Sequence, residues 1–241
     1  MTLSESELNQ IMKLTKEWEV DKMSEVKHPA KYTDTFLPIF AEKLSGKRNV
    51  LDIFAGTCKI SEIKNFGFDG KIYCNEIEPE WGVMGLGSVD SLNIGDAEFL
   101  PYKSNYFEAI CTSPTYGNRM ADHYESRDGS KRITYRHMLG RELDTENTGR
   151  MQWGKKYRDK HDRIWKEAHR VLADGGILIL NVKNHIRKGK EVDVIGWHKN
   201  SLVNNNFSLV EEINIPVKNM GFGANSEKRT NQETIFIFKK R

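Results

Sequence analysis

The sequence predicts an α/β fold of the Rossmann-like type, a mostly parallel sheet with helices on both faces, and three observations predict it. A strand, a glycine turn and a helix follow one another between residues 50 and 63. A second strand over 71–76 ends in an acid. Further along, a helix over 159–172 leads through a Gly-Gly turn into an apolar strand over 177–182. Helices and strands that alternate in this way form βαβ units, whose strands are parallel.

The first strand and its turn form a candidate ligand site. In an open α/β sheet a ligand binds beyond the carboxyl ends of the strands, where small residues let the backbone approach it and a helix N-terminus supplies positive potential. A turn whose glycine serves only a steric need is the alternative. The candidate binding residues in this turn are Asp52, Phe54, Ala55, Gly56 and Thr57.

Two further acids extend the candidate site. Glu76 ends the second strand about twenty residues after the glycine turn, where an acid can accept hydrogen bonds from both hydroxyls of a ribose. Asp96 lies in a later turn, where it can accept from an adenine amine, and Ile77 and Ala97 are the apolar neighbours of these acids. Nicotinamide enzymes use a similar acid, so the pattern indicates an adenosine-type ligand without choosing a cofactor. The alternative for Glu76 is a solvated carboxylate at a strand end, and the alternative for Asp96 is an Asx turn in which it bonds its own backbone.

The segment Cys111-Thr112-Ser113-Pro114-Thr115-Tyr116-Gly117 follows a strand over 106–111. Taken in order, Asp-x-Phe-x-Gly, the acid-ended strand, Gly-Asp-Ala and Ser-Pro-x-Tyr resemble the motifs of class I S-adenosylmethionine-dependent methyltransferases. Among these, the order is similar to that of the DNA amino-methyltransferases, which make N4-methylcytosine or N6-methyladenine. The segment His28-Pro29-Ala30-Lys31-Tyr32 also resembles one that precedes the donor site in several of them.

The resemblance implies a fold, a cofactor and roles for particular residues. The fold is a class I methyltransferase sheet of about seven strands, mostly parallel, with the last strand antiparallel. Strands over 207–213 and 234–238 then form the antiparallel pair that closes the sheet. The cofactor is S-adenosyl-L-methionine, held by the candidate residues above. The activity is site-specific DNA methylation, as in restriction-modification systems, and the catalytic residues are Ser113, Pro114 and Tyr116.

The chemistry explains why such a loop is needed. The exocyclic amine of adenine or cytosine delocalises its lone pair into the ring and is a poor nucleophile. If the Ser113 hydroxyl and the Pro114 carbonyl each accept one N–H, the nitrogen becomes more tetrahedral and its lone pair points at the donor methyl, which is catalysis by positioning and electrostatics. Tyr116 then stacks on a base extruded from the duplex. Serine at position 113 favours cytosine N4 over adenine N6 by family resemblance.

Two residues depart from the family pattern. Thr115 stands where the family usually has a second proline, which stiffens the loop by its fixed φ. Cys58 stands where the donor loop usually has another glycine, so we expect its small side chain to face the methionine end of the cofactor. Methylation of RNA or protein therefore remains an alternative, as does a catalytically silent nucleic-acid-binding relative.

The region after this loop, residues 118–160, is basic, rich in aromatic residues and poor in aliphatic ones, so we expect no core element there. Basic side chains with aromatic platforms suit phosphates and unstacked bases, which predicts a substrate-contact insertion. The basic loops near 185–190 and 218–229 are further candidates for substrate contact. For all three regions the alternative is a solvated loop without a binding role. The predicted substrate-binding residues are Arg119, Lys131, Arg132, Arg136, Arg187, Lys188 and Arg229.

Residues 1–27 predict an N-terminal amphipathic helix, because Leu8, Ile11 and Trp18 recur at near-helical spacing. Residues 28–241 then form a single catalytic domain, as a monomer or homodimer, since about 200 residues suit one domain. Lys plus Arg number 37 against 34 Asp plus Glu, a net charge of +3, so any surface that binds nucleic acid must be local.

The three cysteines are isolated in sequence, and no signal peptide or long apolar run is present. These features predict a protein of a reducing, cytoplasmic compartment that binds no membrane. The histidines are scattered without zinc-ligand spacing, so we expect no metal.

Overall fold

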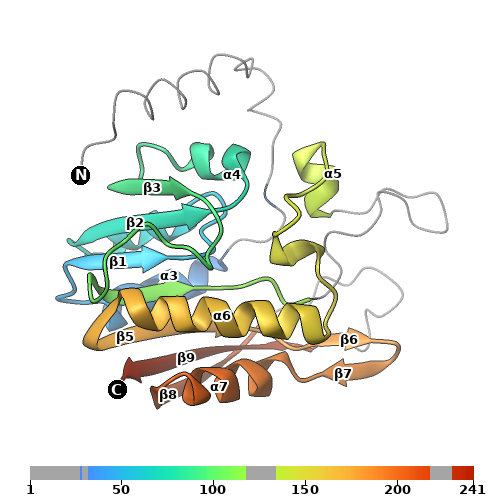
Figure 1. Cartoon of the computed structure of the whole chain (residues 1–241). Coiled ribbons are helices and arrows are strands. Elements are labelled where there is room, and N and C mark those ends of the chain that lie inside the picture. The colour runs from blue at the N-terminus through green and yellow to red at the C-terminus, as the bar shows by residue number, and fades with distance from the viewer. Residues whose placement is uncertain (1–27, 29–31, 118–133, 218–229) are drawn as a thin grey trace.

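The computed structural model describes residues 28, 32–117, 134–217 and 230–241 (Figure 1). The helix predicted over residues 1–27 lies outside the described residues.

A mixed sheet of seven strands forms the centre of the molecule, in the order β3-β2-β1-β4-β5-β9-β8. Neighbouring strands from β3 to β5 are parallel, whereas β9 runs antiparallel to both of its neighbours. The predicted fold class, including the antiparallel last strand, is confirmed. The strands are β1 (Asn49–Asp52), β2 (Lys71–Glu76), β3 (Ser91–Ile94), β4 (Phe107–Thr112), β5 (Leu172–Val182), β8 (Phe207–Pro216) and β9 (Gln232–Lys240).

Helices cover both faces of this sheet, and α6 crosses the face nearer the viewer in Figure 1. Ile164, Trp165 and Ala168 recur at helical spacing, so one stripe of α6 packs on the sheet and excludes water. On the other face α3 and the 3-10 helix η2 pack together. The helical elements are η1 (Asp34–Phe36), α3 (Leu37–Lys43), η2 (Lys59–Phe66), α4 (Pro79–Met84), α5 (Tyr135–Leu139), η3 (Thr148–Arg150), α6 (Lys155–Val171) and α7 (Val194–Asn204).

The strand order reverses between β1 and β4. From β1 the chain proceeds outward to β2 and β3, and it then returns to place β4 on the opposite side of β1. The crossovers leave in opposite directions at such a switch point, so a crevice opens beyond the carboxyl ends of the two strands. The glycine turn after β1 and the segment Ser113 to Tyr116 after β4 both lie at this crevice.

The side chain of Cys58 does not face the donor site, so that sequence-based expectation is wrong. Cys58 has a left-handed backbone (φ 57°) at the start of η2, and its side chain is buried in the core with Ile60 and Ile63. Glycine adopts this conformation without strain, which gives a physical reason for glycine at this place in the family pattern. A Cβ added to Gly85 would lie 2.3 Å from the Cβ of Cys58, so the end of α4 is shaped to accommodate the cysteine.

The expectation that residues 118–160 contain no core element is also wrong for their described part. That part contains α5, η3 and the start of α6. Tyr135, Leu139 and Leu143 are buried in a small cluster against Trp81 of α4. The aliphatic residues are few, but aromatic rings take their place in the packing.

The contact between Gly85 and Cys58 predicts a loss of stability in Gly85→Ala. The added methyl group has no room, so we expect a decrease of about 1–3 kcal/mol in the free energy of unfolding, measured by urea denaturation. Gly154→Ala is the control, because the nearest atom to its added methyl group, the Gln152 carbonyl oxygen, would be 3.7 Å away, an ordinary contact. Equal stability of Gly85→Ala and the wild type would contradict the packing described.

Candidate functional site

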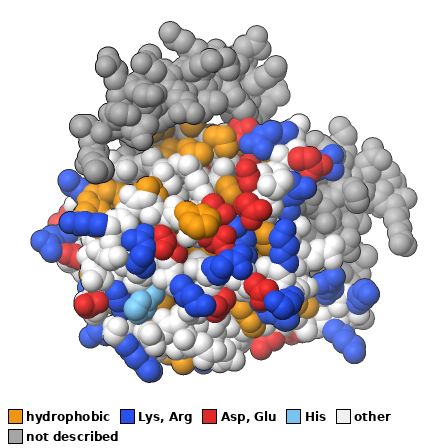
Figure 2. Space-filling view, viewed as in Figure 1, with side chains coloured by type: hydrophobic (Ala, Val, Ile, Leu, Met, Phe, Trp, Pro, Cys, Tyr) orange, Lys and Arg blue, Asp and Glu red, His pale blue; other side chains and the backbone are white. Residues whose placement is uncertain are grey.

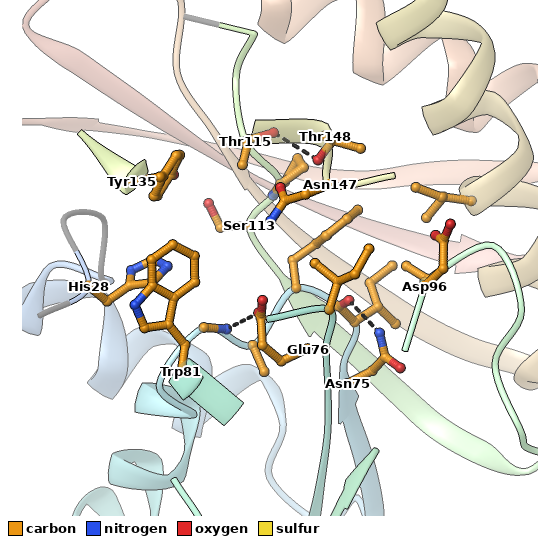
Figure 3. A pocket seen from close by; sticks show the side chains of 18 of the residues that line it. His28, Asn75, Glu76, Trp81, Asp96, Ser113, Thr115, Tyr135, Asn147 and Thr148 are labelled. Atoms are coloured by element: carbon orange, nitrogen blue, oxygen red, sulfur yellow. Dashed lines mark hydrogen bonds between the residues drawn. The ribbon is translucent and has the colours of Figure 1, made fainter. Parts of the chain in front are cut away.

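A cavity of about 300 Å³ opens at the carboxyl ends of β1, β2, β4 and β5 (Figure 3). It brings together both groups of residues that the sequence singled out, the donor-site candidates and the Ser-Pro-x-Tyr loop. All of them except Asp52 line it. The predicted residues in its wall are Phe54, Ala55, Gly56, Thr57, Glu76, Ile77, Asp96, Ala97, Ser113, Pro114 and Tyr116.

Asp52 lies beneath the turn and is fully buried. Its carboxylate accepts hydrogen bonds from the Tyr32 hydroxyl (2.8 Å), the Thr112 hydroxyl (2.7 Å) and the Phe54 N–H (3.1 Å). Burial raises the pKa of Asp52 to about 6, although these hydrogen bonds favour the ionised form. Asp52 therefore ties the ends of β1 and β4 together and shapes the turn from below.

Glu76 faces the cavity and holds the turn from the side. Its carboxylate accepts from the Gly56 N–H at 2.7 Å and from the Glu78 N–H at 3.0 Å. Burial raises its pKa to about 7, against the effect of the two N–H donors. Gly56 has a left-handed backbone (φ 54°), and a Cβ there would lie 3.2 Å from a ring nitrogen of His28. A side chain at Gly56 would therefore close this part of the cavity.

Asp96 lies at the opposite end of the cavity from His28 and Trp81 (Figure 3). One of its oxygens accepts from the Glu98 N–H (3.0 Å) and the other from Lys160 Nζ (2.7 Å). Lys160, which is 1% exposed, also contacts the carboxylates of Glu98 (3.0 Å) and Glu146 (3.1 Å). Carboxylate oxygens of these three acids lie within 4.8 Å of one another with the ammonium group between them, so the lysine takes the place that a metal cation could otherwise take in this cluster.

The loop after β4 brings several hydroxyl groups together. The hydroxyls of Ser113 and Tyr116 are 3.0 Å apart, and both lie near Oδ1 of Asn181, at 3.4 and 3.5 Å. Thr115 restrains this loop although it is not a proline, because its hydroxyl forms a hydrogen bond with the hydroxyl of Thr148 at 2.9 Å. Thr148 thus holds the loop at position 115, where the proteins that the sequence resembles usually have a second proline.

A stretch of chain from 134 to 150, which we call the cover segment, closes one side of the cavity. It supplies Tyr135, Asn147 and Thr148 to the wall. The fully buried Glu78 anchors it: one oxygen accepts from Asn147 Nδ2 (2.8 Å) and from the 144 backbone N–H (2.7 Å). Arg141 lies 2.9 Å from the other oxygen of Glu78 and also pairs with Glu80.

The comparison with solved structures shows the fold of the chain. No protein-family model and no curated protein matches the sequence. Among solved structures, the [4+2]-cyclase SpnF has a TM-score of 0.57 at 14% identity, over 86% of this chain and 80% of that chain. An S-adenosylmethionine-dependent methyltransferase from Methanosarcina mazei has 0.54 at 13% identity, over 84% and 97%. The N-methyltransferase NodS from Bradyrhizobium japonicum has 0.52 at 13% identity, over 86% and 93%.

The chain has the Rossmann-like methyltransferase fold. Identities of this size show the fold alone. The cyclase among the similar structures illustrates that one fold serves different reactions, so the function has to be argued from the site.

Within this methyltransferase fold, sequence reasoning missed several residues of the wall. Asn181 lies at the carboxyl end of β5 beside Ser113 and Tyr116, and the rule that strand ends face the site was sufficient to find it. Trp81, Tyr135 and His28 form an aromatic cluster at one end of the cavity, with ring centroids 4.4 to 5.5 Å apart. The sequence singled out His28 only through the resemblance of its segment to one that precedes the donor site, and no signal indicated that these three rings would meet. The other missed residues of the wall include Tyr32, Glu146, Asn147, Thr148, Lys160 and Glu233.

The described members of the predicted substrate-binding set do not line the cavity. Arg136 pairs with Glu142 at 2.7 Å, and Arg187 donates to the Trp153 carbonyl at 2.9 Å. Lys188 lies in the turn of a hairpin formed by β6 (His185–Arg187) and β7 (Lys190–Val192). Arg119, Lys131, Arg132 and Arg229 lie outside the described residues. In the view of Figure 2, positive and negative side chains are interspersed and form no continuous basic face.

No helix in the described part of the chain has the length and apolar character needed to cross a membrane.

The buried acids under the cover segment predict that Arg141→Met is strongly destabilising. The substitution leaves the side chains of Glu78 (0% exposed) and Glu80 (4% exposed) without their cation, so we expect a loss of about 3–5 kcal/mol in unfolding free energy. Lys155→Met is the control: its partner Asp159 is 46% exposed, and surface ion pairs contribute about 0–1 kcal/mol. Similar losses in the two variants would contradict the anchoring role of Glu78 and Arg141.

Proposed function

We propose that the protein is an S-adenosylmethionine-dependent methyltransferase that transfers a methyl group to the exocyclic amine of a DNA base. One observation carries the proposal: a single cavity is lined both by Glu76 and Asp96 and by the Ser113-Pro114-x-Tyr116 loop. The first pair suits an adenosine-type donor, and the loop suits a planar amine. Because both groups line the same cavity, a methyl donor and an acceptor amine can be bound side by side, as methyl transfer requires.

The wall residues fit the donor. Glu76 has lone pairs left to accept from two ribose hydroxyls, and Asp96 can accept from the adenine amine while Ile77 and Ala97 offer apolar contact. Gly56 lines the cavity without a side chain, and a Cβ there would crowd the ring of His28, which lines the same wall. Among proteins of similar fold, NodS, at 12% identity and a TM-score of 0.51, has a structure described in complex with S-adenosyl-L-homocysteine.

The chain's own residues position the acceptor. The donor, when bound, supplies an electrophilic methyl group on a sulfonium. Ser113 Oγ and the Pro114 carbonyl each accept one N–H of the amine, which directs the nitrogen lone pair at the methyl carbon. The N–C bond forms as the S–C bond breaks, and the proton that the nitrogen then carries leaves to solvent. Tyr116 moves from its contact with Ser113 and stacks on the base.

The serine at position 113 favours cytosine N4 over adenine N6. RNA bases present the same amine and are the main alternative acceptor, followed by a protein amide. In the catalytically silent alternative, the chain would bind nucleic acid and leave the donor unchanged.

The buried carboxyl group of Glu76 predicts that donor binding depends on pH. Only the ionised carboxylate accepts from both ribose hydroxyls, and its pKa in the free protein is about 7. Between pH 8 and 6 the affinity for S-adenosyl-L-homocysteine should therefore fall, approaching about tenfold per pH unit at the acidic end. Calorimetric titration measures this, with Glu76→Gln as a control that should bind weakly at every pH. A flat profile in the wild type would contradict the role of Glu76.

Nucleoside mass spectrometry tests the reaction itself. After incubation of unmodified double-stranded DNA with the protein and isotopically labelled donor, we expect labelled N4-methylcytosine, or N6-methyladenine if the serine preference fails. Tyr116→Ala should retain donor binding and lose about 100-fold or more in turnover, because stacking of the base is lost. A matched RNA acceptor that is labelled equally well would overturn the DNA assignment, and loss of donor binding in Tyr116→Ala would overturn the role of the tyrosine.

A further inference from the structure

A chain of three buried polar side chains runs from the hydrophobic core to the catalytic loop. Trp165 Nε1 lies 3.2 Å from His198 Nδ1, and His198 Nε2 lies 3.0 Å from the Tyr157 hydroxyl. The Tyr157 hydroxyl in turn donates to the backbone carbonyl of Thr115. Trp165, His198 and Tyr157 are each 0% exposed. None of the three lines the cavity, so the mechanism above does not use them.

The direction of every hydrogen bond in this chain follows from its two ends. An indole N–H can only donate, so Nδ1 of His198 accepts and the histidine proton must be on Nε2. A backbone carbonyl can only accept, so the Tyr157 hydroxyl donates to Thr115 and accepts from His198 Nε2. The bonds then point one way, from Trp165 through His198 and Tyr157 to Thr115. One histidine tautomer satisfies both ends, and a second proton on the ring would face the indole N–H.

Burial keeps the ring neutral. It lowers the pKa of His198 well below its ordinary value, and the neighbouring His161 acts in the same direction. Trp165 and Tyr157 lie on α6 and His198 on α7, and Trp165 is packed in the core cluster that includes Ile164 and Ala168. The chain of hydrogen bonds therefore begins at a rigidly packed side chain. It ends on the carbonyl of the peptide group that joins Thr115 to Tyr116.

We propose that Trp165, His198 and Tyr157 are positioning residues that fix the 115–116 peptide and thereby set the geometry of the acceptor loop. The orientation of this peptide determines the position from which the Tyr116 side chain extends. It also determines how the Pro114 carbonyl lies beside Ser113. A second proline would restrict the loop through its own φ, and here a hydrogen bond from the core restricts it instead. The proposal rests on the proposed function, because it assigns this loop to the acceptor.

The first test is Tyr157→Phe, which removes one hydroxyl and keeps the ring. The Thr115 carbonyl loses its buried donor, so we expect kcat to fall about ten- to hundredfold, with the dissociation constant of S-adenosyl-L-homocysteine unchanged within about twofold. Hydrogen–deuterium exchange of the amides over 115–117 should become faster. Tyr106→Phe is the matched control, because it removes a tyrosine hydroxyl that bonds only the hydroxyl of Tyr73 among the interactions seen, at 3.0 Å.

The second test compares His198→Gln with His198→Leu. The glutamine amide offers an oxygen that can accept from Trp165 and an N–H that can donate to Tyr157, so it can reproduce the neutral imidazole, whereas leucine offers neither. We expect His198→Gln to retain most of the turnover and loop protection and His198→Leu to resemble Tyr157→Phe. A merely structural role would lower thermal stability in both variants without separating their values of kcat per folded molecule.

Failure of this inference and failure of the proposed function are distinguishable. Unchanged exchange over 115–117 in Tyr157→Phe overturns the positioning role, whatever the protein methylates. If exchange increases while kcat equals that of Tyr106→Phe, the loop is held by the tyrosine but its position does not matter for transfer, and the proposal is also overturned. If the wild type labels no base, RNA or protein, the proposed function fails, and the catalytic part of this inference fails with it.

Discussion

The capture of backbone N–H groups by two buried carboxylates is the interaction on which the rest of the site depends. Asp52 accepts from the Phe54 N–H and Glu76 accepts from the Gly56 N–H. The glycine turn after β1 is therefore held at two points, from below and from the side. Both acids end neighbouring parallel strands, and only at a switch point does the fold leave a crevice beside them. Hydrogen bonds that also shape a ligand-sized opening offset only part of the cost of burying these carboxylates, since both pKa values remain raised.

The cover segment and the Ser113–Tyr116 loop are held on this frame by contacts between distant parts of the chain. Glu78 continues from the acid-ended strand and bonds Asn147, while Thr115 is tied to Thr148 and Tyr157. Residues 134–157 thus close the side of the cavity next to Glu76 and hold the Ser113–Tyr116 loop on the other side. The arginines of the cover segment anchor it: Arg136 pairs with Glu142, Arg141 with Glu80 of α4, and Arg150 donates to the Leu143 carbonyl.

The sequence predicted those parts of the site that lie within short motifs. The glycine turn, Glu76 and the Ser-Pro-x-Tyr loop were found because strand ends and turn residues leave a local pattern. The cover segment left no such pattern, because its decisive contact joins residues 69 positions apart and its packing uses rings such as Tyr135. The orientation of Cys58 was missed for a different reason: the sequence shows residue size, whereas a left-handed backbone decided which way the side chain points.

Calorimetric titration of the protein with S-adenosyl-L-homocysteine tests the central claim most directly, because proposed donor recognition and the shape of the cavity both depend on Glu76. We predict one binding site in the wild type, strong weakening in Glu76→Ala, and unchanged binding in Glu108→Ala, whose carboxylate instead bonds Arg48. No binding to the wild type, or equal binding to all three proteins, would contradict the account.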